Sequence, residues 1–249
     1  MSFFKGINMP VKLGASLVAE FVGTFALCFV GILAIHHSGG NLLLVALAHG
    51  LILATMISAT LQTSGGQFNP AVTASLMVTG KIKLLDGLAY IFIQLLAGTV
   101  AAVACLALYG AKTVYEGTPA FDPEKVSVGQ ALLAEGIVTF FLVFAVWGTA
   151  ADPRARNVGG FAIGLTVAAN ILAVGPLTGA SMNPARSFGP TLVAALDPSF
   201  SRWSQHWVYW VAPLAGGILA GAVYHVVLWP RDKRGNEPGT ANVPPAVRP

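Results

Sequence analysis

The sequence contains very few charged residues. Asp, Glu, Lys and Arg together make up 10% of its 249 residues, whereas an average soluble domain carries roughly 25%. The mean hydropathy is +0.71, and 55% of the residues are hydrophobic. A chain of this composition cannot cover a water-exposed surface with polar side chains. We therefore expect an integral, multi-pass membrane protein whose main partner is the lipid bilayer.

Cysteine is also scarce, and its scarcity excludes several kinds of site. Cys28 and Cys105 both fall within long apolar stretches, so we predict free buried thiols, not a disulfide or a metal centre. The sequence also offers no nucleophile with a paired base and no cluster of metal ligands. We predict that the protein is not an enzyme and needs no cofactor.

The basic residues indicate how the chain is oriented. The formal net charge is +4 and the isoelectric point is near 9.2. If both termini are cytoplasmic, most lysines and arginines lie in loops on the cytoplasmic side, as the positive-inside rule requires. Membrane topology thus accounts for the basic residues, and we predict no nucleic-acid partner.

Six apolar stretches are long enough to cross about 30 Å of hydrocarbon. They cover residues 13–35, 42–61, 84–108, 128–149, 158–174 and 203–229. Two further apolar segments, 70–79 and 184–194, have about ten residues each. At 1.5 Å per residue, each makes a helix of roughly 15 Å, which reaches half-way across the membrane.

Each short segment opens with the same three residues. Asn69-Pro70-Ala71 and Asn183-Pro184-Ala185 lie 114 positions apart. An Asn side chain caps a helix well, and Pro is favoured at the first helical position, so both triplets predict a helix start. The residues ahead of them, 64–68 and 178–182, must lie against protein or a water-filled space, because irregular backbone is not tolerated against lipid.

The two triplets belong to a duplicated chain. Glu20 corresponds to Glu135, which lies 115 positions later within a similar flanking sequence. We treat residues 1–249 as a single membrane domain, with repeat 1 at about 12–111, repeat 2 at about 128–230, and 231–249 as a disordered cytoplasmic tail. Three spans per repeat invert the second repeat, so the two half-helices should enter from opposite sides and meet at the midplane.

With these motifs the chain resembles the aquaporins, or major intrinsic proteins. The likeness rests on Ser64-Gly65-Gly66-Gln67-Phe68-Asn69-Pro70-Ala71-Val72-Thr73 and on Gly179-Ala180-Ser181-Met182-Asn183-Pro184-Ala185-Arg186-Ser187-Phe188-Gly189-Pro190. It implies an all-α membrane fold with six transmembrane helices and two re-entrant half-helices in an inverted repeat. The water-selective branch is the most similar, and within it the tonoplast type, because residues 149–153 and 169–173 look like its loop and fifth helix.

The resemblance also implies roles for individual residues. Both triplets would line the pore, and a selectivity filter would fall on His49, Ile171, Ala180 and Arg186. Glu20 and Glu135 occupy equivalent places in the repeats, and we interpret them as structural supports for the two loops. Gln67 stands where many members have His, and we expect it to stay clear of the pore.

The predicted function is a passive channel that passes water in single file and excludes protons and ions, with ammonia as a second permeant. A facilitator of small neutral solutes such as glycerol or urea is the alternative. A secondary transporter is a more remote one, because it should also show an ion site. The resemblance further implies a homotetramer, and we expect the cell membrane in preference to the vacuolar membrane.

Overall fold

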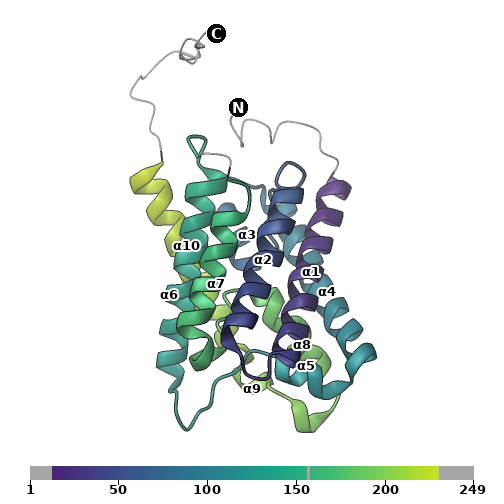
Figure 1. Cartoon of the computed structure of the whole chain (residues 1–249). Coiled ribbons are helices and arrows are strands. Elements are labelled where there is room, and N and C mark those ends of the chain that lie inside the picture. Colours follow the sequence, from purple (N-terminus) through teal and green to yellow (C-terminus); the bar gives the residue numbers. More distant parts are fainter. Residues whose placement is uncertain (1–12, 156–157, 230–249) are drawn as a thin grey trace, which may run out of the picture.

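The protein is a bundle of long apolar helices. In the computed structural model, which describes residues 13–155 and 158–229, six helical segments have the length and hydropathy of membrane spans. They include α1 (Leu13–His37), α2 (Leu42–Thr60), α4 (Leu84–Tyr109), α6 (Val128–Val146) with the π-helical η1 (Trp147–Ala151), α7 (Phe161–Thr178), and α10 (Val208–Val223) with the π-helical η3 (Tyr224–Leu228) (Figure 1). The predicted all-α membrane fold is confirmed. The predicted tail, 231–249, lies outside the described residues.

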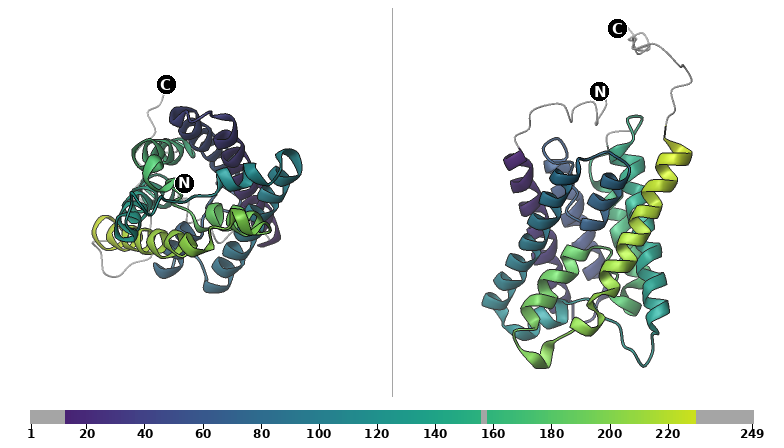
Figure 2. Two further views of the ribbon diagram at one scale, coloured as in Figure 1. Left: turned by 90° about the horizontal axis from the view of Figure 1, so that it is seen from below. Right: turned by 180° about the vertical axis from the view of Figure 1, so that it is seen from behind.

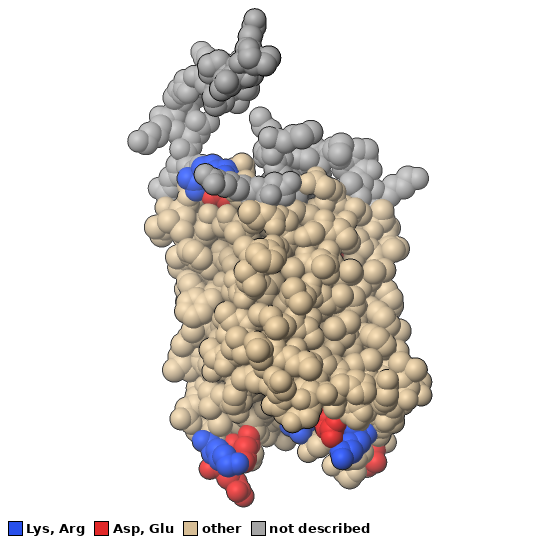
Figure 3. Space-filling model, viewed as in Figure 1, with Lys and Arg blue, Asp and Glu red and all other residues tan. Residues whose placement is uncertain are grey.

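The surface of the bundle suits a bilayer. On the face drawn in Figure 3, charged side chains gather at the two ends and leave an uncharged band between them. Large apolar side chains such as Val18, Phe92 and Leu133 are exposed on the long helices. Because exposed apolar area of this extent is unfavourable in water, lipid is the solvent that fits these helices. We call the end where α1 begins and η3 finishes the terminal face, and the other end the opposite face.

Two short helices lie close to the opposite face, α5 between the sequence halves and α9 within the second half. Helix α5 (Ala111–Gly117) follows α4 after Gly110, whose φ of 84° ends the longer helix. This part of the chain falls between the two predicted repeats, and its helix is not predicted from the sequence. The η2 turn (Pro198–Phe200) and α9 (Trp203–His206) likewise precede α10, where one continuous span from 203 is expected.

Helix α7 begins and ends later than the predicted 158–174. Gly160 precedes its first turn, and Gly179, with a φ of 81°, forms a left-handed C-cap whose N–H donates to the Gly175 carbonyl. Pro176 lies within the last turn without ending the helix. Helix α7 therefore ends at the Gly179 cap and not at Pro176, because the positive φ at the cap favours glycine.

The two half-helices enter the bundle from opposite ends. α3 (Pro70–Val78) runs toward the terminal face and α8 (Pro184–Ala194) toward the opposite face (Figure 1). Seen along the bundle axis, the long helices surround them (Figure 2). Each half-helix packs against a long helix from the other half of the chain, α3 against α10 and α8 against α4.

Glycine allows this close packing. A Cβ placed on Gly98 of α4 would lie 2.5 Å from the Ala185 carbonyl oxygen, and one on Gly217 of α10 would lie 2.9 Å from the Ala71 carbonyl oxygen. Any larger residue at either position would push the neighbouring half-helix away. The two halves are thus interlocked, and the start of each half-helix is held by the other half.

Candidate functional site

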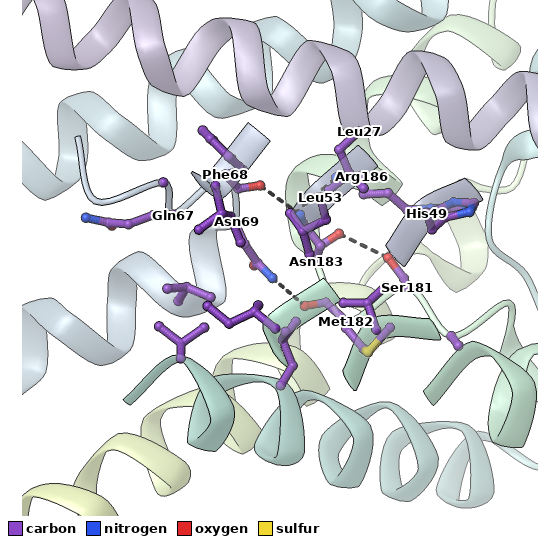
Figure 4. Close-up of a pocket in the computed structure, with 18 of the residues that line it drawn as sticks. Leu27, His49, Leu53, Gln67, Phe68, Asn69, Ser181, Met182, Asn183 and Arg186 are labelled. Carbon is purple, nitrogen blue, oxygen red and sulfur yellow. Dashed lines mark hydrogen bonds between the residues drawn. The ribbon is translucent and has the colours of Figure 1, made fainter. Parts of the chain in front are cut away.

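A cavity lies inside the bundle, beside the starts of the two half-helices (Figure 4). Its wall is mostly apolar, and its polar side chains come from the segments that the sequence singles out. It is lined by Leu27, His49, Leu53, Ile57, Gly66, Gln67, Phe68, Asn69, Val72, Leu142, Val146, Ile163, Val167, Ile171, Ala180, Ser181, Met182, Asn183 and Arg186. The cavity therefore brings together both predicted pore asparagines and all four predicted filter residues.

The two asparagines face each other near the middle of the cavity. Asn69 Nδ2 donates to the Met182 carbonyl at 2.8 Å, and Asn183 Nδ2 donates to the Phe68 carbonyl at 2.8 Å (Figure 4). Each asparagine thus donates to the backbone carbonyl of the residue that precedes the other asparagine. This reciprocal pair ties the starts of the two half-helices together.

Helix capping fixes how each asparagine points. Asn69 Oδ1 accepts from the Ala71 N–H at 2.8 Å, and Asn183 Oδ1 accepts from the N–H groups of Ala185 at 2.9 Å and Arg186 at 3.2 Å. Pro70 and Pro184 occupy the first helical positions. Since a side-chain amide has two N–H donors and only one is used in the reciprocal pair, the second remains for a molecule in the cavity.

The residues just before the asparagines have unusual backbone conformations. Phe68 has a φ of 49° and Met182 a φ of 54°, which is the left-handed region that residues other than glycine seldom adopt. Ala180 shares this feature, with a φ of 43°. Strain of this kind persists only where the surroundings hold the backbone in place. Here the constraint comes from two buried glutamates.

Glu20 of α1 and Glu135 of α6 hold the two loops from behind. Glu20 accepts from the N–H groups of Gln67 at 2.9 Å and Phe68 at 2.7 Å, and Glu135 accepts from those of Ser181 and Met182 at 2.8 Å each. Both side chains are fully buried. Because the loop N–H groups are bound on the outer side, the Phe68 and Met182 carbonyls are free to accept from the facing asparagines.

The four predicted filter residues lie toward the opposite face. His49 Nδ1 is 2.8 Å from the Val45 carbonyl, which can only accept, so this nitrogen carries the proton in the neutral ring. The other ring nitrogen, Nε2, lies 3.5 Å from Arg186 Nη2 and can accept from it. Ile171 and Ala180, exposed by only 4% and 2%, complete this part of the wall.

One group that orients Arg186 is not predicted from the sequence. Arg186 Nη1 donates to the Gly117 carbonyl at 3.1 Å, so the last residue of α5 takes part in positioning the guanidinium. A carbonyl contributes to a site without any side-chain signature, and α5 itself lies in a stretch that reads as a connection. No residue pattern reveals this contact.

The expectation that Gln67 stays clear of the pore is wrong. Gln67 borders the cavity on the side of the asparagines that leads to the terminal face (Figure 4). Its backbone N–H donates to Glu20 behind the loop, and its side chain extends away from the asparagine pair (Figure 4). Cys28 and Cys105 do fulfil their prediction, because both are free thiols buried between helices.

Comparisons with known proteins agree with these features. Residues 9–224 match the family model described as major intrinsic protein. The chain is 45% identical to "Aquaporin TIP4-4" of Zea mays over 223 residues, which cover 84% of each chain. It is 42% identical to "Probable aquaporin TIP3-2" of Arabidopsis thaliana over 239 residues, covering 89% of this chain and 86% of the relative.

A solved structure has the same fold. The aquaglyceroporin from Plasmodium falciparum superposes with a TM-score of 0.76, covering 87% of this chain and 97% of that one, at 24% sequence identity. At this level of identity the likeness concerns the arrangement of the helices. It carries no argument about which solute this chain accepts.

The hydrogen bonds of Glu20 predict the effect of a conservative substitution. In Glu20→Gln, a side-chain NH₂ replaces one carboxylate oxygen, which accepts from one loop N–H and from one side chain. One buried loop N–H therefore loses its partner, at a cost of about 1–3 kcal/mol. We expect a lower midpoint of thermal unfolding for the detergent-purified variant. Glu124→Gln, at an exposed carboxylate, is the matched control and should unfold like the wild type. Equal midpoints of thermal unfolding for all three proteins would contradict the interpretation that Glu20 supports the loop.

Proposed function

Since this chain belongs to the major intrinsic protein family, we propose that it conducts water in single file and excludes protons and other ions. Members of the family are membrane channels for water and small solutes, and not enzymes, so the chain is a multi-pass membrane channel. The observation that carries the finer proposal is the reciprocal asparagine pair in the middle of the cavity.

The asparagine pair supports an orienting role toward water. Each Oδ1 is occupied by a helix cap and each Nδ2 has one N–H left, so the pair offers only donors to the cavity. A water molecule whose oxygen accepts from both asparagines must point its two hydrogens away from them, one toward each neighbour in the file. Such a water cannot accept a hydrogen bond from either neighbour, so a proton cannot pass through it along the file.

The opposed half-helices support the exclusion of cations. Each helix start carries the equivalent of about half a positive charge. At an effective dielectric constant of about 20 and a distance of ~4 Å, two such charges repel a monovalent cation by roughly 4 kcal/mol. Arg186 adds a third positive group nearer the opposite face. In this proposal water crosses the barrier because it carries no net charge.

The proposal assigns the filter to His49, Ile171, Ala180 and Arg186, with one channel in each subunit of a homotetramer. The proposal also puts both termini in the cytoplasm. The relatives named above are tonoplast-type channels. This likeness favours a vacuolar membrane, in place of the cell membrane predicted from the sequence.

The function is tested with the purified wild-type protein in liposomes. Stopped-flow light scattering under a sucrose gradient should show a water permeability well above that of bare liposomes and proportional to protein content. A pH-sensitive dye in the same vesicles should show no added proton flux under a proton gradient. Proton flux that rises with protein content would contradict the proposal, and so would water permeability equal to that of bare lipid.

The filter also supports ammonia as a second permeant. His49 provides a nitrogen that can form hydrogen bonds, whereas Ile171 faces the same part of the cavity with an apolar side chain. A wall of this mixed kind suits a small neutral base better than a glycerol molecule, which needs a larger apolar surface for its carbon atoms.

Replacing His49 tests this part of the proposal. In His49→Phe, the bulkier ring narrows the filter and removes the hydrogen-bonding nitrogen, so ammonia flux should fall severalfold. The measurement is the internal pH change of proteoliposomes after an ammonium gradient is applied, with bare liposomes as the baseline. If the wild type matched bare lipid, or the variant matched the wild type, ammonia would be removed from the proposed permeants.

A further inference from the structure

Two glycines on the inner side of α1 each face an aromatic ring that borders the cavity. A Cβ placed on Gly23 would overlap the Phe68 ring, and a Cβ placed on Gly31 would overlap the His49 ring. Leu27 lies half-way between the two glycines, four residues from each and on the same side of the helix, and it borders the cavity itself. The inner side of α1 therefore has two recesses, one on each side of Leu27.

The recess at Gly31 is matched to the His49 ring. The three atoms nearest to a Cβ at this position would all belong to that ring: Nε2, which the Cβ would overlap, and Cδ2 and Cε1, at 3.0 Å each. A methyl group at position 31 and the ring therefore cannot occupy this space together. Glycine is less favourable than alanine inside a helix, so this buried position needs a reason in packing, and the ring supplies it.

Three contacts limit where the His49 ring can move. Its Nδ1 donates to the Val45 carbonyl at 2.8 Å, and its Nε2 lies 3.5 Å from Arg186 Nη2 (Figure 4). Gly31 adjoins the ring on a further side, and the cavity is the open one. A side chain added at position 31 would therefore drive the ring toward the cavity and displace the nitrogen that can accept from Arg186.

We propose that Gly31 is a positioning residue for the filter. Its missing side chain sets how far the His49 ring withdraws from the channel, and thereby sets the width of the channel next to Arg186. Gly31 is not among the cavity-lining residues in the described part of the chain, so it acts through His49 alone. The inference rests on the proposed water-channel function and extends it to a residue outside the predicted filter.

The test is Gly31→Ala, which puts the smallest side chain into the recess. The water permeability per channel in proteoliposomes should fall roughly fivefold or more, because the ring must move back against the new methyl group to open the filter. Fivefold corresponds to about 1 kcal/mol, the lower end of the cost of overpacking a close-packed interior. Gly14→Ala is the matched control, because Gly14 is exposed on the same helix and its Cβ would meet no atom within 4 Å. It should keep the wild-type permeability.

Removing the ring separates this role from ordinary helix packing. His49→Ala widens the filter, and adding Gly31→Ala to it should change the water permeability by less than about twofold, since no ring remains to be displaced. A glycine that served only to pack α1 would instead cause the same fold loss with and without the ring. If Gly31→Ala alone does not fold, the double variant should still fold, with the permeability and the midpoint of thermal unfolding of His49→Ala.

Three results would overturn the role of Gly31 while the water-channel proposal stands. They are wild-type permeability in the folded Gly31→Ala protein, an equal fold loss with and without the ring, and a double variant that does not fold when His49→Ala does. A wild-type protein that leaves liposomes no more permeable than bare lipid would instead overturn the proposed function, and this inference with it.

Discussion

The reciprocal hydrogen bonds of Asn69 and Asn183 are the constraint on which the rest of the structure depends. Each asparagine uses its oxygen to begin its own half-helix and one N–H to hold the loop before the other half-helix. Two positive helix ends thereby meet in the middle of an apolar bundle, an arrangement that repulsion between them alone would disfavour. The remaining N–H groups face the cavity, so the same contacts define both the fold and the polar centre of the channel.

This centre is stable only because the surrounding helices over-determine it. Buried Glu20 and Glu135 bind the loop N–H groups from outside, which keeps Phe68 and Met182 in strained conformations with their carbonyls turned to the asparagines. The half-helices then pack on glycines of long helices from the other half of the chain. Loop geometry, helix capping and interhelical packing therefore support one another.

The sequence predicts the features that depend on side-chain type and spacing. The Asn-Pro pairs give both half-helix starts, and the apolar lengths give six spans, because caps and membrane thickness act locally. Contacts made by the backbone are not predicted. The Gly117 carbonyl that holds Arg186, and helix α5 that places it, leave no pattern in the side chains. The position of Gln67 is predicted wrongly because the direction of a side chain in an irregular loop depends on the tertiary contacts of its backbone, here with Glu20.

The central claim is that the paired asparagines and helix ends form the barrier to cations, and a double substitution tests it most directly. Asn69→Asp combined with Asn183→Asp removes both reciprocal donors and puts negative charge where the positive helix ends meet. The measurement is the reversal potential of a planar bilayer holding the purified variant under a sodium gradient. We expect the double variant to carry a cation current whose reversal potential shifts toward the sodium equilibrium value. The wild type should carry no current. A correctly folded double variant that still passes water and carries no cation current would contradict it.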